Sequence, residues 1–486
     1  MNALQQDYLN KANMNMPNIR RKTIKLSDSF VLQQSGDKAI IDLGNYYVGY
    51  FAFTMDYVKG YGAPVRFKVK FCETKEELEM DFSTYKGTLS ASWLQEEIVT
   101  IDNIGKYKMP RRYAARYIEI TILSASDSAR FSKFEFVAVS SANDKMLQNV
   151  DIKDKELAVI DNVAINTLKN CMHRVFEDGP KRDRRLWIGD LYLESLANYY
   201  TFNQLDIVRR CLYLFSAADT NEVGVLPSHV YENPRFVSGD WFLQDYALLF
   251  VVALCEYYLH TSDEETFLDI YPMAKSQIDA IGVLRDDNGA IVVGKGCDVF
   301  IDWTYTLRKT TSLNGVYLYT LNILCDTLKK LNHCDFNYYN TCYKNSLNIA
   351  KRIFIDGKTG LIKNKYDEEQ KSVHSAVWLI LGDVINGDAA WEILRDTLYD
   401  ETSEKPITPY MNHYLVEAMI KLGKKEQAEK HVKAYWGAMV EKGADSFYEV
   451  FVPGNPELSP YENKMMNSMC HAWSCTPTYF IRKILG

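Results

Sequence analysis

The densest group of chemically reactive side chains lies between residues 177 and 190. This stretch, Glu-Asp-Gly-Pro-Lys-Arg-Asp-Arg-Arg-Leu-Trp-Ile-Gly-Asp, holds four carboxylates, four basic side chains and one tryptophan. Alternating charges on a solvated turn need no function. However, Gly179-Pro180 signals a turn, and Trp187 is costly to leave exposed. The combination therefore indicates a functional site, and its residue types are typical of a site that binds a sugar.

Further motifs follow this stretch in a fixed order. Residues 178–190 read Asp-Gly-x-Lys-Arg-Asp-Arg-x-x-Trp-x-Gly-Asp, and the later segments are Phe300-Ile301-Asp302-Trp303, Thr408–Ala418, Tyr435-Trp436-Gly437, Gly443–Glu449 and Ser468–Ser474. The ordered set resembles the α-L-rhamnosidases of glycoside hydrolase family 78, in a branch that has Asp-Gly where commoner members have Asp-Cys-Pro. The resemblance implies an exo-acting, inverting enzyme that removes terminal α-L-rhamnose from small oligosaccharides or glycosides.

Composition limits the other classes of function. The chain has 486 residues, of which 47% are hydrophobic, and a formal net charge of −7, which opposes nonspecific attraction to nucleic acid. The first 21 residues lack the apolar core of a secretory signal, and the apolar run Ala247–Cys255 is far shorter than the roughly 20 residues that cross a bilayer. Ten cysteines without a Cys-x-x-Cys pair indicate a reducing compartment. We expect a cytoplasmic monomer or homodimer without a nucleic-acid or membrane partner.

Hydrophobic periodicity divides the chain near residue 150. From about Ile24 to Ser141 apolar and polar residues alternate, which predicts strands. We expect residues 1–150 to form an antiparallel β-sandwich, and the resemblance implies that this is a jelly-roll-like accessory domain. Its loop Ser90-Ala91-Ser92-Trp93 is a candidate to reach the substrate.

Residues 151–486 have the period of helices. An apolar stripe from Ile160 to Cys171 predicts one helix, and eleven more segments are helical by the same test. They lie near 188–203, 203–218, 240–261, 263–286, 313–331, 335–354, 372–382, 387–399, 407–422, 424–441 and 472–485. Twelve helices in consecutive hairpins fit an (α/α)6 toroid, and the resemblance favours it over a solenoid.

Glycoside hydrolysis needs a carboxyl group that protonates the leaving oxygen and a second carboxylate that attacks or activates water. The resemblance places Asp183 near the general acid and Glu449 at the general base. Arginines beside Asp183 would lower the pKa of its carboxyl, which does not suit an acid. Glu177 and Asp178 therefore compete for this role, and Asp183 could instead pair with Arg182 or Arg185. Glu449 could alternatively be an ordinary glutamate of an edge strand.

Other residues of the motifs suit substrate binding. Charged groups form strong hydrogen bonds with sugar hydroxyls, and each tryptophan offers a flat apolar wall or belongs to the core. The expected set is Asp178, Arg182, Trp187, Asp190, Trp241, Asp302, Trp303, His471 and Trp473. Asp240 is a further candidate, whereas His374 is expected to be structural.

Two other functions stay open at this point. One is a related glycosidase or lyase that acts on another deoxy sugar or a uronide, and the other is a sugar-binding relative without activity. There is no His-Glu-x-x-His motif, glycine-rich phosphate loop or Gly-x-Ser-x-Gly elbow. We therefore expect neither a catalytic metal nor a cofactor.

Overall fold

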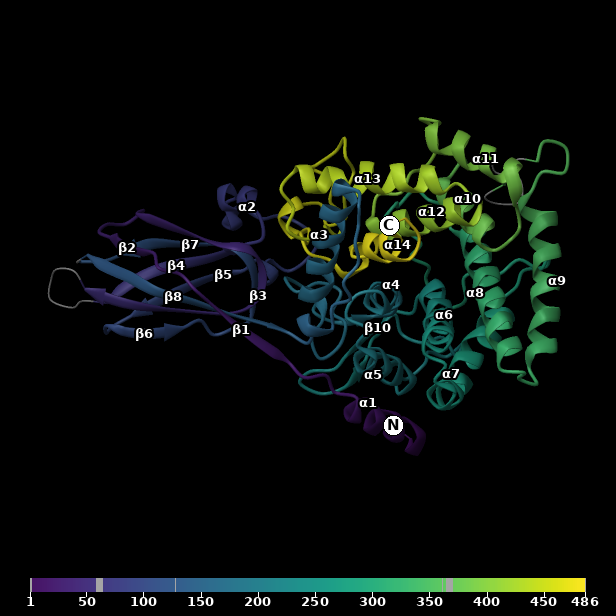
Figure 1. Ribbon diagram of the computed structural model, residues 1–486, viewed down its shortest axis with the longest axis horizontal. Coiled ribbons are helices and arrows are strands. Elements are labelled where there is room, and N and C mark those ends of the chain that lie inside the picture. The colour runs from purple at the N-terminus through teal and green to yellow at the C-terminus, as the bar shows by residue number, and fades with distance from the viewer. Residues whose placement is uncertain (1, 58–63, 127, 361, 364–369, 486) are drawn as a thin grey trace.

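The computed structural model describes residues 2–57, 64–126, 128–360, 362–363 and 370–485. A strand-rich part and a helical part lie next to each other along the longest axis of the molecule (Figure 1). Among the described residues, we find no helix whose length and apolar character would let it cross a membrane. The ten cysteines are all free thiols.

Eight strands form the first part, and every pairing between them is antiparallel. Strand β3 belongs to two layers, because its first half pairs with β7 and its second half with β8. The change of partner follows a register shift between Asp42 and Tyr47. The strands are β1 (Arg20–Lys25), β2 (Ser29–Leu32), β3 (Lys38–Tyr57), β4 (Val65–Cys72), β5 (Glu96–Ile101), β6 (Gly105–Lys108), β7 (Tyr113–Ser124) and β8 (Ala129–Ser140).

The core of this part lies between the two layers. Phe67 of β4 meets Phe131 of β8 edge to face at 5.2 Å between ring centroids, although these strands are not hydrogen-bonded neighbours. Alternate residues of β4 and β7 point into the same apolar cluster. The predicted antiparallel sandwich is therefore confirmed.

In the described part of residues 155–485, twelve helices form a closed double ring. The inner ring is made by α4, α6, α8, α10 and α12, each in contact with the next, and residues 472–480 close it against α4. The outer helices α3, α5, α7, α9, α11 and α13 cover it, so the (α/α)6 fold is confirmed. The bounds are α3 (Lys155–Cys171), α4 (Ile188–Tyr199), α5 (Leu205–Ser216), α6 (Gln244–Thr261), α7 (Glu264–Gly282), α8 (Thr310–Lys330), α9 (Phe336–Phe354), α10 (Val373–Leu381), α11 (Gly387–Tyr399), α12 (Pro409–Lys421), α13 (Lys425–Glu441) and α14 (Pro477–Phe480).

The inner and outer helices differ in how much of their surface is buried. Every residue of α4 is buried, and α6 is buried along nearly its whole length. Outer helices such as α9 and α11 bury one face and expose the other. A helix that is apolar on all sides must be covered on all sides, which identifies α6 as an inner helix, whereas α4 buries Asp190, Glu194 and Asn198 and is not marked by its pattern.

Several short elements had no counterpart in the sequence prediction. Helix α1 (Ala3–Met14) precedes the sandwich but packs on α5 of the helical part. Helix α2 (Lys75–Glu79) follows β4 and extends from the sandwich toward the helices. Strands β9 (Leu186–Trp187), β10 (His229–Tyr231) and β11 (Val237–Ser238) form a small sheet. Strand β9 directly precedes α4, and the other two strands lie in the connection from α5 to α6.

Candidate active site

A cavity of about 350 Å³ gathers most of the side chains that the sequence singles out. Its walls come from segments that lead into the inner helices and from one loop of the sandwich. Ten of the eleven predicted site residues line it: Asp178, Arg182, Asp183, Trp187, Asp190, Trp241, Trp303, Glu449, His471 and Trp473. Segments far apart in sequence thus converge on one site.

Glu449 lies in this cavity with its carboxylate almost fully buried. Arg182 Nη2 and the Tyr461 hydroxyl donate hydrogen bonds to its two oxygens, and the Ser468 N–H donates a third at 3.2 Å. Burial alone would raise the pKa of Glu449, but the Arg182 guanidinium and these hydrogen bonds hold it below the ordinary value. Glu449 is therefore ionised at neutral pH, as a general base must be.

Asp183 faces the same cavity from a strained turn. Its φ is +58° and that of Arg184 is +55°, a left-handed conformation that is uncommon for residues other than glycine. Two such residues in succession persist only where the surroundings enforce them, and strain of this kind concentrates at functional sites. The Asp183 side chain is 19% exposed, so its carboxyl can exchange protons with solvent.

The arginines around Asp183 are directed to other partners. Arg184 donates through Nε to the Pro180 carbonyl at 2.8 Å, and the Arg185 guanidinium lies 4.6 Å from the centre of the Tyr231 ring. Arg182 is bound to Glu449, and its Nη1 is 3.8 Å from Asp183 Oδ1. The sequence predicted that Arg182 would bind sugar hydroxyls. In the structure its guanidinium group is paired with the Glu449 carboxylate.

Asp178 and Asp190 are buried acids of the same cavity. Burial raises the pKa of Asp178 well above the ordinary value, and the charges of Asp183 and Asp190 add to the effect. Burial also raises the pKa of Asp190, together with the charge of Glu449. Burial thus shifts both carboxyl groups toward the protonated form, which can donate a hydrogen bond as well as accept one.

Five buried polar atoms on cavity residues have no hydrogen-bond partner in the described part of the chain. They are Trp187 Nε1, Asp190 Oδ1, His229 Nε2, Trp303 Nε1 and His471 Nδ1. Buried polar groups are normally paired, since an unpaired one costs about 1–3 kcal/mol. Burial lowers the pKa of His471 to about 3, so its ring is neutral and offers one donor and one acceptor. Two of the five atoms, Asp190 Oδ1 and His471 Nδ1, lie 3.4 Å from each other.

Aromatic rings form the apolar sides of the cavity. Trp187 stacks on His229 at 4.4 Å between centroids, and Phe300 stacks on Trp473 at 5.7 Å. Trp303 meets Tyr461 edge to face at 5.8 Å. The sandwich adds Leu89 and Trp93 to this wall, so the loop near residue 90 does reach the cavity.

Two acidic candidates are placed outside the cavity. Asp302 is fully buried, where its oxygens lie 2.9 Å from His374 Nε2 and accept hydrogen bonds from the Thr408 hydroxyl at 2.7 Å and the Ile407 N–H at 3.0 Å. It ties loops together and is not among the residues that line the cavity. Glu177 forms a two-pronged ion pair with Arg112 at 2.6 and 3.0 Å.

Glu177 is also unsuited to proton donation. Burial would raise the pKa of its carboxyl, but Arg112 outweighs burial and the pKa is lowered. Of the two competitors for the acid role, Asp178 lines the cavity and Glu177 does not.

The glycine of the Trp-x-Gly-Asp motif has a packing role. A Cβ atom on Gly189 would lie 2.6 Å from Tyr246 Cζ, closer than any side chain can pack. The missing side chain lets α4 and α6 approach at the floor of the cavity. Asp190 is thereby held beside Tyr246, another cavity residue.

Several cavity residues were not predicted. His229 and Tyr231 come from β10, where His229 pairs with Trp187 across the small sheet. Tyr461 lies in a loop whose sequence has no periodicity, and its position depends on its contacts with Arg182 and Glu449. The alternation in His229-Val230-Tyr231 is a weak strand signal that could have indicated the first two.

One group of potential metal ligands lies elsewhere. Among the described residues, the ligand atoms of His333, Cys334 and Asp335, between α8 and α9, fall within 4.8 Å of one another. Asp335 is already engaged by Lys275 at 2.7 Å and the Tyr271 hydroxyl at 2.8 Å. None of the three lines the cavity.

Comparison with known proteins follows the same division of the chain. The N-terminal domain model of glycosyl hydrolase family 78 α-rhamnosidases matches residues 6–141. The model of the bacterial α-L-rhamnosidase six-hairpin glycosidase domain matches residues 146–485. No curated protein matches the chain in sequence.

Solved structures of rhamnosidases also match the chain. A rhamnosidase from Klebsiella oxytoca with rhamnose bound is 35% identical, with a TM-score of 0.92 over 98% of each chain. A family 78 rhamnosidase of Bacillus sp. GL1 shares the fold at 19% identity and a TM-score of 0.78, over 94% of this chain and 47% of the other. The resemblance found in the sequence is confirmed, and the chain belongs to the α-L-rhamnosidases of glycoside hydrolase family 78.

Proposed function

We propose that this enzyme removes a terminal α-L-rhamnose residue with inversion, using Asp183 as general acid and Glu449 as general base. The observation that carries the proposal is the convergence of a buried, ionised Glu449, a partly exposed Asp183 and the four predicted tryptophans on one cavity. Charged groups form strong hydrogen bonds with sugar hydroxyls, and aromatic rings offer apolar walls for the faces of a sugar ring. The Klebsiella oxytoca relative was solved with rhamnose bound, which supports the choice of sugar.

Cavity size favours an exo mode of action. A volume of about 350 Å³ is at the small end of ligand sites, which span roughly 300–1,000 Å³. It suits one sugar ring with the first part of the leaving group. The aromatic wall from Trp93 and Trp303 then faces the apolar parts of the substrate.

Asp183 is the best candidate for the acid because of what surrounds it. Its carboxyl is partly exposed and pairs with Arg182 only at 3.8 Å, since that guanidinium contacts Glu449 and Arg184 is bound to the Pro180 carbonyl. Asp178, the remaining competitor, is fully buried, and its Oδ1 accepts the Arg185 N–H at 2.9 Å. An acid that must recover its proton in each turnover needs access to solvent, which Asp183 has.

Initial rates on aryl glycosides test the assignment. We expect release from the α-L-rhamnoside but not from the α-L-fucoside, α-L-arabinoside or β-D-glucuronide. Glu449→Gln and Asp183→Asn should each lower the rate by at least about a hundredfold. Proton NMR of the first product should show the anomer opposite to that of the substrate.

Other outcomes lead to defined corrections. Activity that survives Asp183→Asn but is lost in Asp178→Asn would transfer the acid role to Asp178. A product that keeps the anomeric configuration would refute inversion. A folded enzyme that releases none of these sugars would instead support the sugar-binding alternative.

A further inference from the structure

The loop that carries Arg182 is held from behind by the sandwich. Lys181, one residue earlier, points away from the cavity and forms ion pairs with Glu73, at 3.2 Å, and with Glu77. All three side chains are at most 2% exposed. Glu73 follows β4 and Glu77 lies in α2, so both carboxylates belong to the accessory domain.

The same loop holds the segment from Met465 to Met469. Lys181 Nζ donates to the carbonyls of Met465 and Asn467 at 3.3 Å, and Arg182 Nε donates to the carbonyl of Met466 at 3.1 Å. Three successive carbonyls therefore accept hydrogen bonds from two neighbouring cations. This segment cannot move without displacing Arg182.

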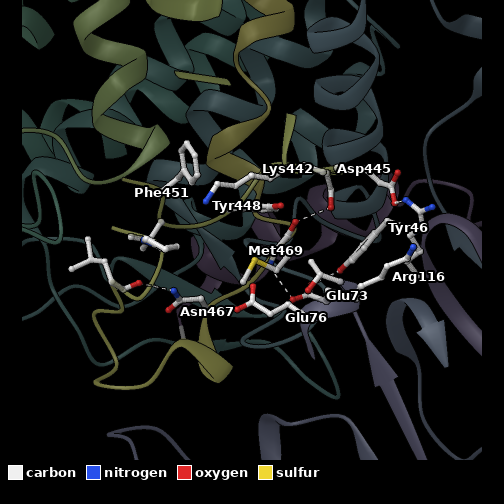
Figure 2. A pocket seen from close by; sticks show the side chains of 18 of the residues that line it. Tyr46, Glu73, Glu76, Arg116, Lys442, Asp445, Tyr448, Phe451, Asn467 and Met469 are labelled. Carbon is white, nitrogen blue, oxygen red and sulfur yellow. Dashed lines mark hydrogen bonds and ion pairs between the residues drawn. The ribbon is translucent and has the colours of Figure 1, made fainter. Parts of the chain in front are cut away.

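Two successive amides of this segment serve two different carboxylates. The Ser468 N–H donates to Glu449 Oε2 at 3.2 Å, and the Met469 N–H donates to Glu73 Oε2 at 2.9 Å. The other oxygen of Glu73 accepts the Tyr46 hydroxyl at 2.7 Å. Figure 2 shows Glu73 between Tyr46 and Met469. The accessory-domain acid and the proposed catalytic base thus accept hydrogen bonds from two adjacent residues.

The segment around Glu449 separates two cavities, and its neighbours Phe447 and Phe451 are buried in the core. A second cavity, of about 580 Å³, lies on the far side and is lined by Tyr448 and Val450, the neighbours of Glu449 in sequence (Figure 2). Glu449 itself faces the smaller cavity. The Glu449 N–H donates to the Ser468 carbonyl at 3.0 Å, so the segment around Glu449 is tied to residues 465–469, which Glu73 holds through the Met469 N–H.

We infer that Glu73 is a positioning residue for the reaction, which fixes Lys181 and residues 465–469 so that Arg182 and the Ser468 N–H meet Glu449. The inference rests on the proposed function of Glu449. Buried groups that orient a reacting side chain matter because a misplacement of about 1 Å can cost a hundredfold in rate. The accessory domain therefore takes part in catalysis without supplying a reacting group.

Two substitutions separate this role from simple stabilisation. Glu73→Ala removes both acceptors, and we expect kcat to fall about tenfold to a hundredfold with KM changed less than threefold. Glu73→Gln keeps an acceptor for the Met469 N–H, so it should retain at least about a third of the wild-type kcat. Asp161→Ala is the matched control, because Asp161 is an equally buried acid paired with Arg482 at 2.9 Å.

The pH dependence identifies how the loss arises. If Arg182 and Ser468 lose their positions, the pKa of Glu449 rises, and the acidic limb of kcat/KM moves to higher pH in Glu73→Ala. If Glu73 acts only through its negative charge, removing that charge lowers the pKa of Glu449 and moves the limb to lower pH. The second result would overturn the inference.

Hydrogen exchange gives a readout that needs no substrate. We expect the peptide that covers residues 465–471 to exchange at least about tenfold faster in Glu73→Ala than in wild type or in Asp161→Ala. Unchanged exchange together with unchanged kcat would refute the positioning role. Because exchange does not depend on turnover, a failure of the proposed rhamnosidase activity would not be mistaken for a failure of this inference.

If Glu73→Ala does not fold, Glu73→Asp provides a second test of the inference. Glu73→Asp keeps the charge but withdraws the carboxylate by about 1.5 Å, the length of one C–C bond. We expect its kcat to fall by roughly threefold to tenfold, with faster exchange over residues 465–471. Wild-type kcat and exchange in Glu73→Asp would refute the inference.

Discussion

Replacing Arg182 with methionine tests the electrostatic reading of the site most directly. The guanidinium contacts the Glu449 carboxylate inside the protein, and both side chains are at most 4% exposed. An opposite charge in contact lowers the pKa of a carboxyl group by about 1–3 units. Methionine keeps much of the side-chain volume but leaves burial of Glu449 unopposed. The pKa of Glu449 should therefore rise by about 1–3 units, or roughly 1.4–4 kcal/mol.

The assay is the pH profile of kcat/KM on an aryl α-L-rhamnoside between pH 4 and pH 8. In wild type the acidic limb should lie at low pH, because the pKa of Glu449 is below its ordinary value. In Arg182→Met the limb should move up by about 1–3 units. Arg185→Met is the matched control, since the Arg185 guanidinium lies against Tyr231 and not against Glu449.

Stability should change with pH in the same variant. In wild type the folded pKa of Glu449 is below the unfolded value of about 4.3, so its ionisation stabilises the fold above that pH. This contribution is lost as pH falls through the folded pKa. In Arg182→Met the folded pKa is raised, so the fold favours the protonated acid and loses stability as pH rises. The difference in Tm between variant and wild type should therefore be larger at pH 7 than at pH 4.

One result would refute this reasoning. If the acidic limb of Arg182→Met stays where it is in wild type and in Arg185→Met, the guanidinium does not control the ionisation of Glu449. Arg182 would then act on the substrate, as the sequence alone suggested. A change confined to KM, with an unmoved limb, would support that reading.

Three further predictions rest on packing and burial. Gly189→Ala places a methyl group 2.6 Å from Tyr246 Cζ, so unfolding free energy should fall by about 1–3 kcal/mol, which urea denaturation measures. Trp93→Ala removes the sandwich's ring from the cavity wall, and should raise KM for rhamnosides with a bulky aromatic leaving group more than for methyl rhamnoside. Glu194 is fully buried, without a hydrogen-bond partner among the described residues, and burial raises the pKa of its carboxyl well above the ordinary value. The fold therefore loses stability as pH rises, and Glu194→Met should raise Tm by several degrees at pH 8 but little at pH 4.

Hydrophobic periodicity predicted the strands and helices, and the family resemblance was needed to choose the toroid over a solenoid. Alternation predicts strands where one face is buried, and segments that are apolar on all sides predict inner helices, as in α6. The first residues of the helices were predicted less accurately than their existence. The segment predicted from residue 240 becomes helical only at Gln244, because Asp240 and Trp241 belong to the cavity wall.

The chemical roles within the motifs were harder to predict than their positions. Asp302 and Asp190 are both acids next to an aromatic or apolar neighbour in a motif. The Asp302 carboxylate, however, accepts hydrogen bonds from Thr408 and Ile407. Whether an acid faces a cavity or ties loops together depends on contacts between segments about a hundred residues apart. No local pattern records such contacts, and the same holds for Tyr461.

The arginine-rich loop illustrates how backbone conformation decides chemistry that composition leaves open. In sequence, Asp183 stands between two arginines, which argues against a proton donor. In the fold, the left-handed turn at residues 183–184 directs the neighbouring side chains apart, so that Arg182 reaches Glu449 and Arg184 reaches the Pro180 carbonyl. The strained turn thus lets one short loop place a positive charge against the proposed base while Arg182 Nη1 stays 3.8 Å from the proposed acid. A substitution that relaxes the turn, such as Arg184→Gly, should keep the fold yet lower kcat, because glycine adopts the same φ without holding it.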